Sequence, residues 1–219
     1  MMKNEFTSAP NSEASLDLKS PRADGQWKVQ AVVFAVIVLL GIASRFWLVD
    51  WPNFKPVAAM VLFGAFYFRR SWAAVAALIA IMMLSDLKLG VYDWKLAGCV
   101  YASLALAGVL GVWIKRSIES GAERRMGALQ VGRFAIASIV MSTAFFVLTN
   151  AAVWAMGQWY PATWSGLVSC YASAVPFYRA TLVGDLFFSG VIVAGYCAVE
   201  SFQLAALKSA NSLAIARVG

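Results

Sequence analysis

The chain contains no histidine among its 219 residues. Zinc peptidases, Ser-His-Asp hydrolases and most haem proteins use imidazole as a ligand or a base, so this absence argues against all three classes. Its three cysteines, Cys99, Cys170 and Cys197, have no C-x-x-C spacing, which indicates neither a zinc site nor a redox pair. The sequence therefore predicts no metal site, and its motifs indicate no cofactor.

Motifs for nucleotide hydrolysis are also missing. The pattern G-x-x-x-x-G-K-[ST] does not occur, so the chain has no P-loop with which to hydrolyse ATP. No nucleophile with an adjacent base is visible, so we expect no catalytic residues and a protein that is not an enzyme. Asp86 and Asp185 could together supply acid and base groups, which leaves an enzyme as the least favoured alternative. Active transport would need a separate ATPase or coupling module, or an ion gradient.

Charged residues are scarce, at 13% of the chain against about 25% in soluble proteins. Hydrophobic residues make up 61%, and the mean hydropathy is +0.71. A helix needs roughly 20 apolar residues to cross a hydrocarbon layer of about 30 Å. The apolar runs predict six spans, near residues 29–49, 56–68, 71–90, 95–114, 134–156 and 180–207. The second is too short to cross alone, which predicts a tilted, shielded or partly re-entrant helix.

Polar sequence flanks the apolar part of the chain. Residues 1–27 lack apolar periodicity and are predicted to form a disordered cytoplasmic tail. Residues 28–208 would form the six-span membrane domain, and residues 209–219 a second cytoplasmic tail. All but five of the 18 Lys and Arg residues lie in or at the edges of these tails, or in the turns after the second and fourth spans. Because such residues are enriched on the cytoplasmic side, both termini are predicted to be cytoplasmic.

The sequence thus predicts an all-α integral membrane protein with six transmembrane helices, multi-pass in the bacterial inner (cytoplasmic) membrane. The lipid bilayer is its first expected partner. The net charge of +7 follows from the basic residues that flank the spans. No nucleic acid partner is therefore expected.

A few polar residues near the predicted outer ends of the spans give the strongest functional signal. A charge at the centre of a spanning helix costs at least ~2.5–3.5 kcal/mol, so these groups should face each other or a water-filled cavity. Helical spacing places them on two stripes, which are Thr143, Phe146, Asn150 and Trp154 on the fifth span and Tyr178, Thr181 and Asp185 on the sixth. The stripes could hold helices together, with Asp185 paired to Arg179 or Arg45, or they could line a ligand cavity. We favour the cavity.

Residues 157–179 are predicted to form the longest outer connection. The segment is rich in Trp and Tyr and carries one charge, on Arg179. This composition is typical of an interfacial helix in the aromatic belt of a membrane protein. A lid over the cavity, bounded by Pro161 and Pro176, is the functional alternative, and both interpretations can hold together.

Seven short segments between residues 45 and 196 resemble, in order, signatures of the bacterial domain-of-unknown-function 6580 family, which is described as candidate transport proteins. They are NFKPVAAMVLFG (53–64), SDLKLG (85–90), VYAS (100–103), FFVLTNAAVW (145–154), YP (160–161), SGL (165–167) and PFYRATLVGD (176–185). The resemblance implies a fold similar to the substrate-binding S components of energy-coupling-factor vitamin transporters, some of which work without their ATPase partners. Lys55 replaces the Thr of the family's usual Asn-x-Thr-Pro, which predicts a more anionic substrate.

These observations predict a membrane transport protein, S-component-like, that captures a small-molecule solute from the periplasmic side for uptake. The solute implied by the resemblance is a vitamin or similar metabolite. The predicted substrate-binding residues are Asn53, Lys55, Asp86, Asn150, Trp154, Tyr160, Tyr178, Arg179 and Asp185. The rival hypothesis is a structural or assembly subunit of a larger membrane complex, in which the same residues only hold helices together. A filled outer half with no cavity would favour the rival.

The distribution of basic residues predicts the topology. Reporter fusions within residues 115–133 should report the cytoplasm, and fusions within residues 157–179 should report the periplasm. Paired alkaline phosphatase and fluorescent-protein fusions measure both compartments. A periplasmic signal from a fusion at Arg124 would contradict the predicted orientation.

Overall fold

The computed structural model describes residues 21–90, 93–120 and 127–216, and these residues form six α-helices and no strand. The helices are α1 (Pro21–Trp47), α2 (Val57–Tyr67), α3 (Trp72–Leu89), α4 (Trp94–Glu119), α5 (Ala128–Ala155) and α6 (Trp164–Ala216). All except α2 are long and apolar enough to cross a membrane, which confirms the predicted all-α membrane architecture. Both α1 and α6 run beyond the predicted limits of the membrane domain. The predicted tails at residues 1–20 and 217–219 lie outside the described residues.

The short helix α2 lies inside the bundle. Its 11 residues extend only about 16 Å, roughly half the thickness of the hydrocarbon layer. It contacts α1, α3, α4 and α6, and most of its residues are buried. A helix this short is tolerated at membrane depth only where protein surrounds its ends, because no water is there to satisfy the backbone. The prediction of a shielded second helix is therefore confirmed.

Helix α4 makes the closest approach to α2. A side chain at Gly111 would place its Cβ 2.2 Å from the carbonyl oxygen of Leu62, so only glycine permits this crossing. One turn further along α4, the Lys115 ammonium donates hydrogen bonds to the carbonyls of Phe68 (2.7 Å) and Arg69 (3.2 Å). These bonds stabilise the C-terminal end of α2, where helix carbonyls lack backbone partners. The two contacts hold the middle and the C-terminal end of α2 against α4.

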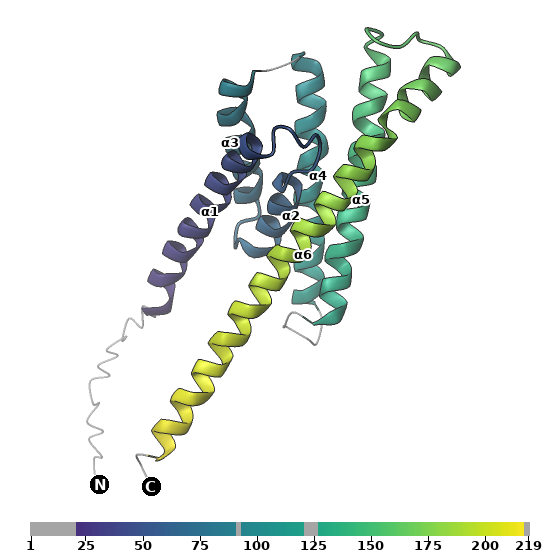
Figure 1. The fold of residues 1–219 in the computed structure, drawn as a ribbon. Coiled ribbons are helices and arrows are strands. Elements are labelled where there is room, and N and C mark those ends of the chain that lie inside the picture. The colour runs from purple at the N-terminus through teal and green to yellow at the C-terminus, as the bar shows by residue number, and fades with distance from the viewer. Residues whose placement is uncertain (1–20, 91–92, 121–126, 217–219) are drawn as a thin grey trace, which may run out of the picture.

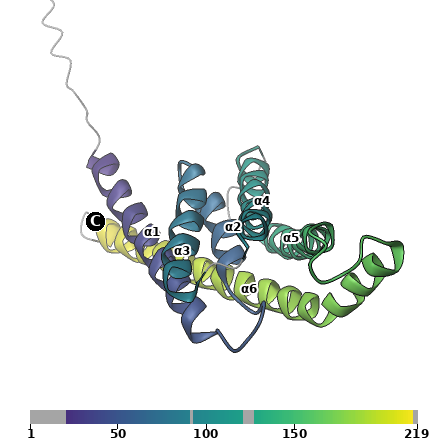
Figure 2. The same cartoon turned by 90° about the horizontal axis from the view of Figure 1, so that it is seen from above.

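Helix α6 differs from the prediction. The segment 157–179 was expected to be a connection, but the connection covers only residues 156–163, and residues 164–179 form the first turns of α6. Pro176, expected to bound a lid, lies inside the helix. Proline is tolerated in membrane helices because neighbouring groups and local adjustments satisfy the freed carbonyl. The 53-residue helix would be about 80 Å long if straight, and Figure 2 shows its first part turned away from the rest.

The bundle has two distinct ends (Figure 1). The upper end carries the connections 48–56 and 156–163, whereas the lower end carries the start of α1, the end of α6 and the turn 68–71. The basic residues of that turn, Arg69 and Arg70, therefore lie at the lower end with Lys115. Most of the polar residues predicted for the outer side lie in the upper half. The structure thus separates the two groups of residues as the sequence predicts.

The crossing of α4 over α2 predicts that Gly111→Ala destabilises the protein. The new Cβ would meet backbone rather than a flexible side chain, and overpacking of this kind costs about 1–3 kcal/mol. The melting temperature in detergent should fall by several degrees. Gly98→Ala, on the same helix, is the matched control, since its Cβ would meet nothing within 4 Å. Equal melting temperatures for the two variants would refute the close approach.

Candidate ligand-binding site

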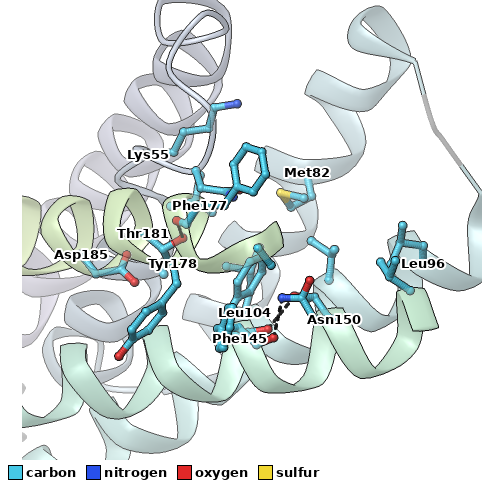
Figure 3. A pocket seen from close by; sticks show the side chains of 18 of the residues that line it. Lys55, Met82, Leu96, Leu104, Phe145, Asn150, Phe177, Tyr178, Thr181 and Asp185 are labelled. Atoms are coloured by element: carbon cyan, nitrogen blue, oxygen red, sulfur yellow. Dashed lines mark hydrogen bonds between the residues drawn. The ribbon is translucent and has the colours of Figure 1, made fainter. Parts of the chain in front are cut away.

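A cavity of about 340 Å³ lies in the upper half of the bundle. Its wall is built from the end of α1, Met82 on α3, the connection before α2 with the first turn of α2, and the facing sides of α4, α5 and α6 (Figure 3). Most of the wall is apolar, with Leu104, Phe145 and Phe177 among the larger side chains. Ligand pockets in proteins are typically about 300–1,000 Å³ and mainly apolar with a few polar groups. This cavity lies at the small end of that range.

Five of the predicted binding residues line the cavity, namely Asn53, Lys55, Asn150, Tyr178 and Asp185. Two come from the connection before α2, one from α5 and two from α6. Residues far apart in the sequence are therefore brought to one space, as the cavity hypothesis requires. Their role in binding stays a prediction.

The connection 48–56 is held against α6 by aromatic packing. The ring of Phe54 lies 5.2 Å from that of Phe188 and 6.1 Å from that of Phe187, measured between centroids. Glycine at position 184 allows the Phe54 ring to pack this closely against α6, because a Cβ there would lie 3.1 Å from the ring. Asn53 has a φ of 62°, a left-handed conformation that asparagine tolerates better than most residues. The local fold thus gives a structural reason for asparagine at this position.

Lys55 follows Phe54 in the same connection, outside the spanning helices, and lines the cavity. Burial, and secondly the positive charge of Arg45, lower the pKa of the Lys55 ammonium below its usual value of 10.5. No acidic side chain among the described residues forms an ion pair with it. Lys55 is therefore a partly desolvated cation facing the cavity, where an anionic group could bind.

The two stripes predicted on the fifth and sixth spans face each other across the α5–α6 interface. The hydroxyls of Thr143 and Tyr178 are 3.0 Å apart, and the rings of Phe146 and Tyr178 are 4.9 Å apart between centroids. The Asn150 amide donates to the carbonyl of Phe146 in its own helix, at 2.8 Å. Its side chain is therefore not used to hold α5 to α6.

Asp185 is buried, with 3% of its surface exposed, yet it forms part of the cavity wall. The Ser142 hydroxyl on α5 donates to one of its carboxyl oxygens at 2.6 Å. One turn below, the hydroxyls of Ser138 and Ser189 are joined at 2.9 Å. The interpretation that paired Asp185 with Arg179 or Arg45 is wrong, because Arg45 forms its ion pair elsewhere and Arg179 is exposed.

Asp86 does not line the cavity. Its carboxylate forms an ion pair with Arg45 at 2.8 Å, and the two side chains are 9% and 11% exposed. The Tyr101 hydroxyl on α4 donates to the other Asp86 oxygen, and Arg45 also donates to the Ser85 hydroxyl at 2.6 Å. This network joins α1, α3 and α4. The structure thus gives Asp86 the helix-joining role that the rival hypothesis assigned to all polar residues.

Three further predicted residues, Trp154, Tyr160 and Arg179, lie outside the cavity wall. The Trp154 indole donates to the Pro161 carbonyl at 3.1 Å, which holds the connection 156–163 to the end of α5. Sequence reasoning missed the apolar wall, including Phe145 and Phe177. Apolar residues that face a cavity and those that face lipid have the same composition, so only their place in the bundle distinguishes them.

Comparison with known proteins gives one match. A model for a family described as "Family of unknown function (DUF6580)" matches residues 26–207. No curated protein and no solved structure matches the chain. The matched range covers the cavity and all six helices, apart from the first residues of α1 and the last of α6.

The Arg45–Asp86 pair predicts a specific stability pattern. Arg45→Met alone leaves a buried carboxylate without its cation and should cost about 3–5 kcal/mol. Arg45→Met combined with Asp86→Leu removes both charges and should recover most of that loss. Melting temperatures of the ligand-free protein measure both effects. A double variant as unstable as Arg45→Met would show that the ion pair is not what joins these helices.

Proposed function

The chain belongs to the DUF6580 family, and we propose that it is a membrane transport protein that binds a small solute in the upper cavity for uptake. The cavity carries this proposal, because polar side chains from three separate segments converge on a mainly apolar space. This is the usual composition of a small-molecule site. A subunit whose polar residues only hold helices together would need no such space.

The proposed direction of transport follows from the two ends of the bundle. The lower end carries the basic turn 68–71, which in the bacterial inner membrane would face the cytoplasm. Both chain ends would then be cytoplasmic, and the cavity would lie nearer the periplasmic face. The solute would enter from the periplasm.

The proposed solute is a vitamin or similar metabolite. The aromatic rings of Phe145, Phe146 and Phe177 suit a planar or apolar body, and Asn150 and Tyr178 offer hydrogen bonds. The assignment to vitamins rests on the resemblance to S components. Lys55 favours a solute with an anionic group.

Movement of the solute would use energy from outside this chain, since its sequence has no P-loop. A separate ATPase or coupling module is the partner implied by the resemblance, and an ion gradient is the alternative. Ala31 and Ala35 lie exposed on one stripe of α1 and would allow another helix to approach closely. The proposed protein is a carrier and not an enzyme.

The proposal predicts that a small molecule co-purifies with the protein. Ala174→Phe places a ring in the cavity and should remove that molecule, because Ala174 lines the wall. Ala172→Phe is the control, since Ala172 is exposed two residues away on α6. Mass spectrometry of extracts from the detergent-solubilised variants measures the molecule, and melting temperatures check that each variant folds.

Loss of the molecule from Ala174→Phe but not from Ala172→Phe would support the proposal. If no small molecule accompanies the wild type and none raises its melting temperature, the solute-binding function is wrong. The structural-subunit hypothesis would then be the better account of the polar residues.

A further inference from the structure

The cavity wall contains a lysine and an aspartate that do not pair with each other. Lys55 and Asp185 both line the cavity, yet the ion pair found among the described residues joins Arg45 to Asp86. The polar partner of Asp185 is the Ser142 hydroxyl, which is neutral. Lys55 is partly buried and Asp185 is buried, and neither forms an ion pair with another described side chain. Partial desolvation makes an oppositely charged partner at either group favourable.

The two groups are held apart by the fold. Lys55 lies in the connection above Gly184, whereas Asp185 faces α5 and is fixed by Ser142. Figure 3 shows the Lys55 ammonium pointing away from Asp185, with Thr181 and Phe177 on the α6 side of the cavity. The body of the cavity between them is apolar and aromatic. A molecule that satisfied both charges would need them at separate positions on an apolar frame.

The other charges of the wall are already balanced. The Arg45 guanidinium is bound by Asp86 and by the Ser85 hydroxyl, so its charge is largely satisfied. The remaining lining residues are uncharged. Lys55 and Asp185 are therefore the basic and the acidic group of the wall that pair with no other charged side chain among the described residues. A solute with an amine and a carboxylate would supply a partner for each of them, whereas a solute with a single charged group would supply a partner for only one.

From this arrangement we infer that the solute is a zwitterion with a separated amine and carboxylate on an apolar or aromatic body. Its amine binds Asp185, its carboxylate binds Lys55, and its body lies against Phe145, Phe146 and Phe177. The inference rests on the proposed solute-binding function and narrows its substrate class. It also explains why the cavity has a cation at one side and a carboxyl group at another.

Three probes of the same shape test the charge requirement. 4-(Aminomethyl)benzoate carries both groups at opposite ends of a ring, 4-methylbenzylamine lacks the carboxylate, and 4-methylbenzoate lacks the amine. Isothermal titration calorimetry on protein stripped of co-purifying molecules measures their affinities. The doubly charged probe should bind about tenfold or more tightly than either of the others, because each of those leaves Lys55 or Asp185 without a charged partner.

Two variants should change the preference in opposite ways. In Asp185→Asn the amine of the probe should no longer add to its affinity, so 4-methylbenzoate should bind as tightly as 4-(aminomethyl)benzoate. In Lys55→Gln the carboxylate of the probe should no longer add to its affinity, so 4-methylbenzylamine should bind as tightly as the doubly charged probe. Ligand-free melting temperatures identify any variant that fails to fold, and Lys55→Arg, which keeps the charge, should keep the wild-type preference.

The carboxylate subsite also predicts a pH dependence. The Lys55 pKa is lowered by burial and by Arg45, so the ammonium loses its charge at a lower pH than an ordinary lysine. Affinity for 4-methylbenzoate should therefore fall as pH rises through that pKa, whereas Lys55→Arg should hold its affinity. The other titratable groups lining the cavity are Arg45 on α1 and Tyr178 and Asp185 on α6.

The outcomes separate this inference from the proposed function. Wild-type protein that binds the doubly charged probe no better than the singly charged ones would overturn the zwitterion assignment. So would a co-purifying solute that carries one charge or none, although solute binding itself would then stand. Reciprocal loss of preference in the two variants would support the assignment of each group to its subsite.

Discussion

The short length of α2 is the constraint on which the rest of the structure depends. A helix of 11 residues cannot cross the hydrocarbon layer, so the connection before it must descend into the bundle. Figure 1 shows this connection lying below the upper ends of α3, α4 and α5. Backbone outside a helix is tolerated there only where protein covers it or where it borders a cavity. α6 covers it through Phe54 and Gly184, and the cavity lies beside it.

The polar residues of the upper half fall into two groups with different physical roles. Arg45, Asp86 and Tyr101 satisfy one another and join three helices. Lys55 and Asp185 are left facing a space. The first group thus joins helices within this chain, and a binding role is proposed for the second.

Much of the fold could be predicted from the sequence, because five helices contain apolar runs long enough to cross a bilayer. The extent of α6 could not be predicted, because proline commonly marks a helix boundary, whereas Pro176 lies inside the helix. In the site, the stripes on α5 and α6 were predictable from helical spacing, as the contact of Thr143 with Tyr178 shows. The partner of Arg45 could not be predicted from the sequence. Asp86 and Asp185 are the same residue type in similar apolar surroundings, and only the arrangement of the helices decides which of them meets the guanidinium.

Helix α6 connects the cavity mechanically to the opposite end of the molecule. It carries the Thr181–Asp185 part of the wall and continues without interruption to Ala216, roughly 50 Å further along its axis. A rod of that length acts as a lever. A tilt of about 5° at the cavity, too small to disturb most side-chain contacts, would move the far end by about 4–5 Å. If the proposed solute tilted α6 on binding, the end of the helix at the opposite end of the bundle would therefore be displaced.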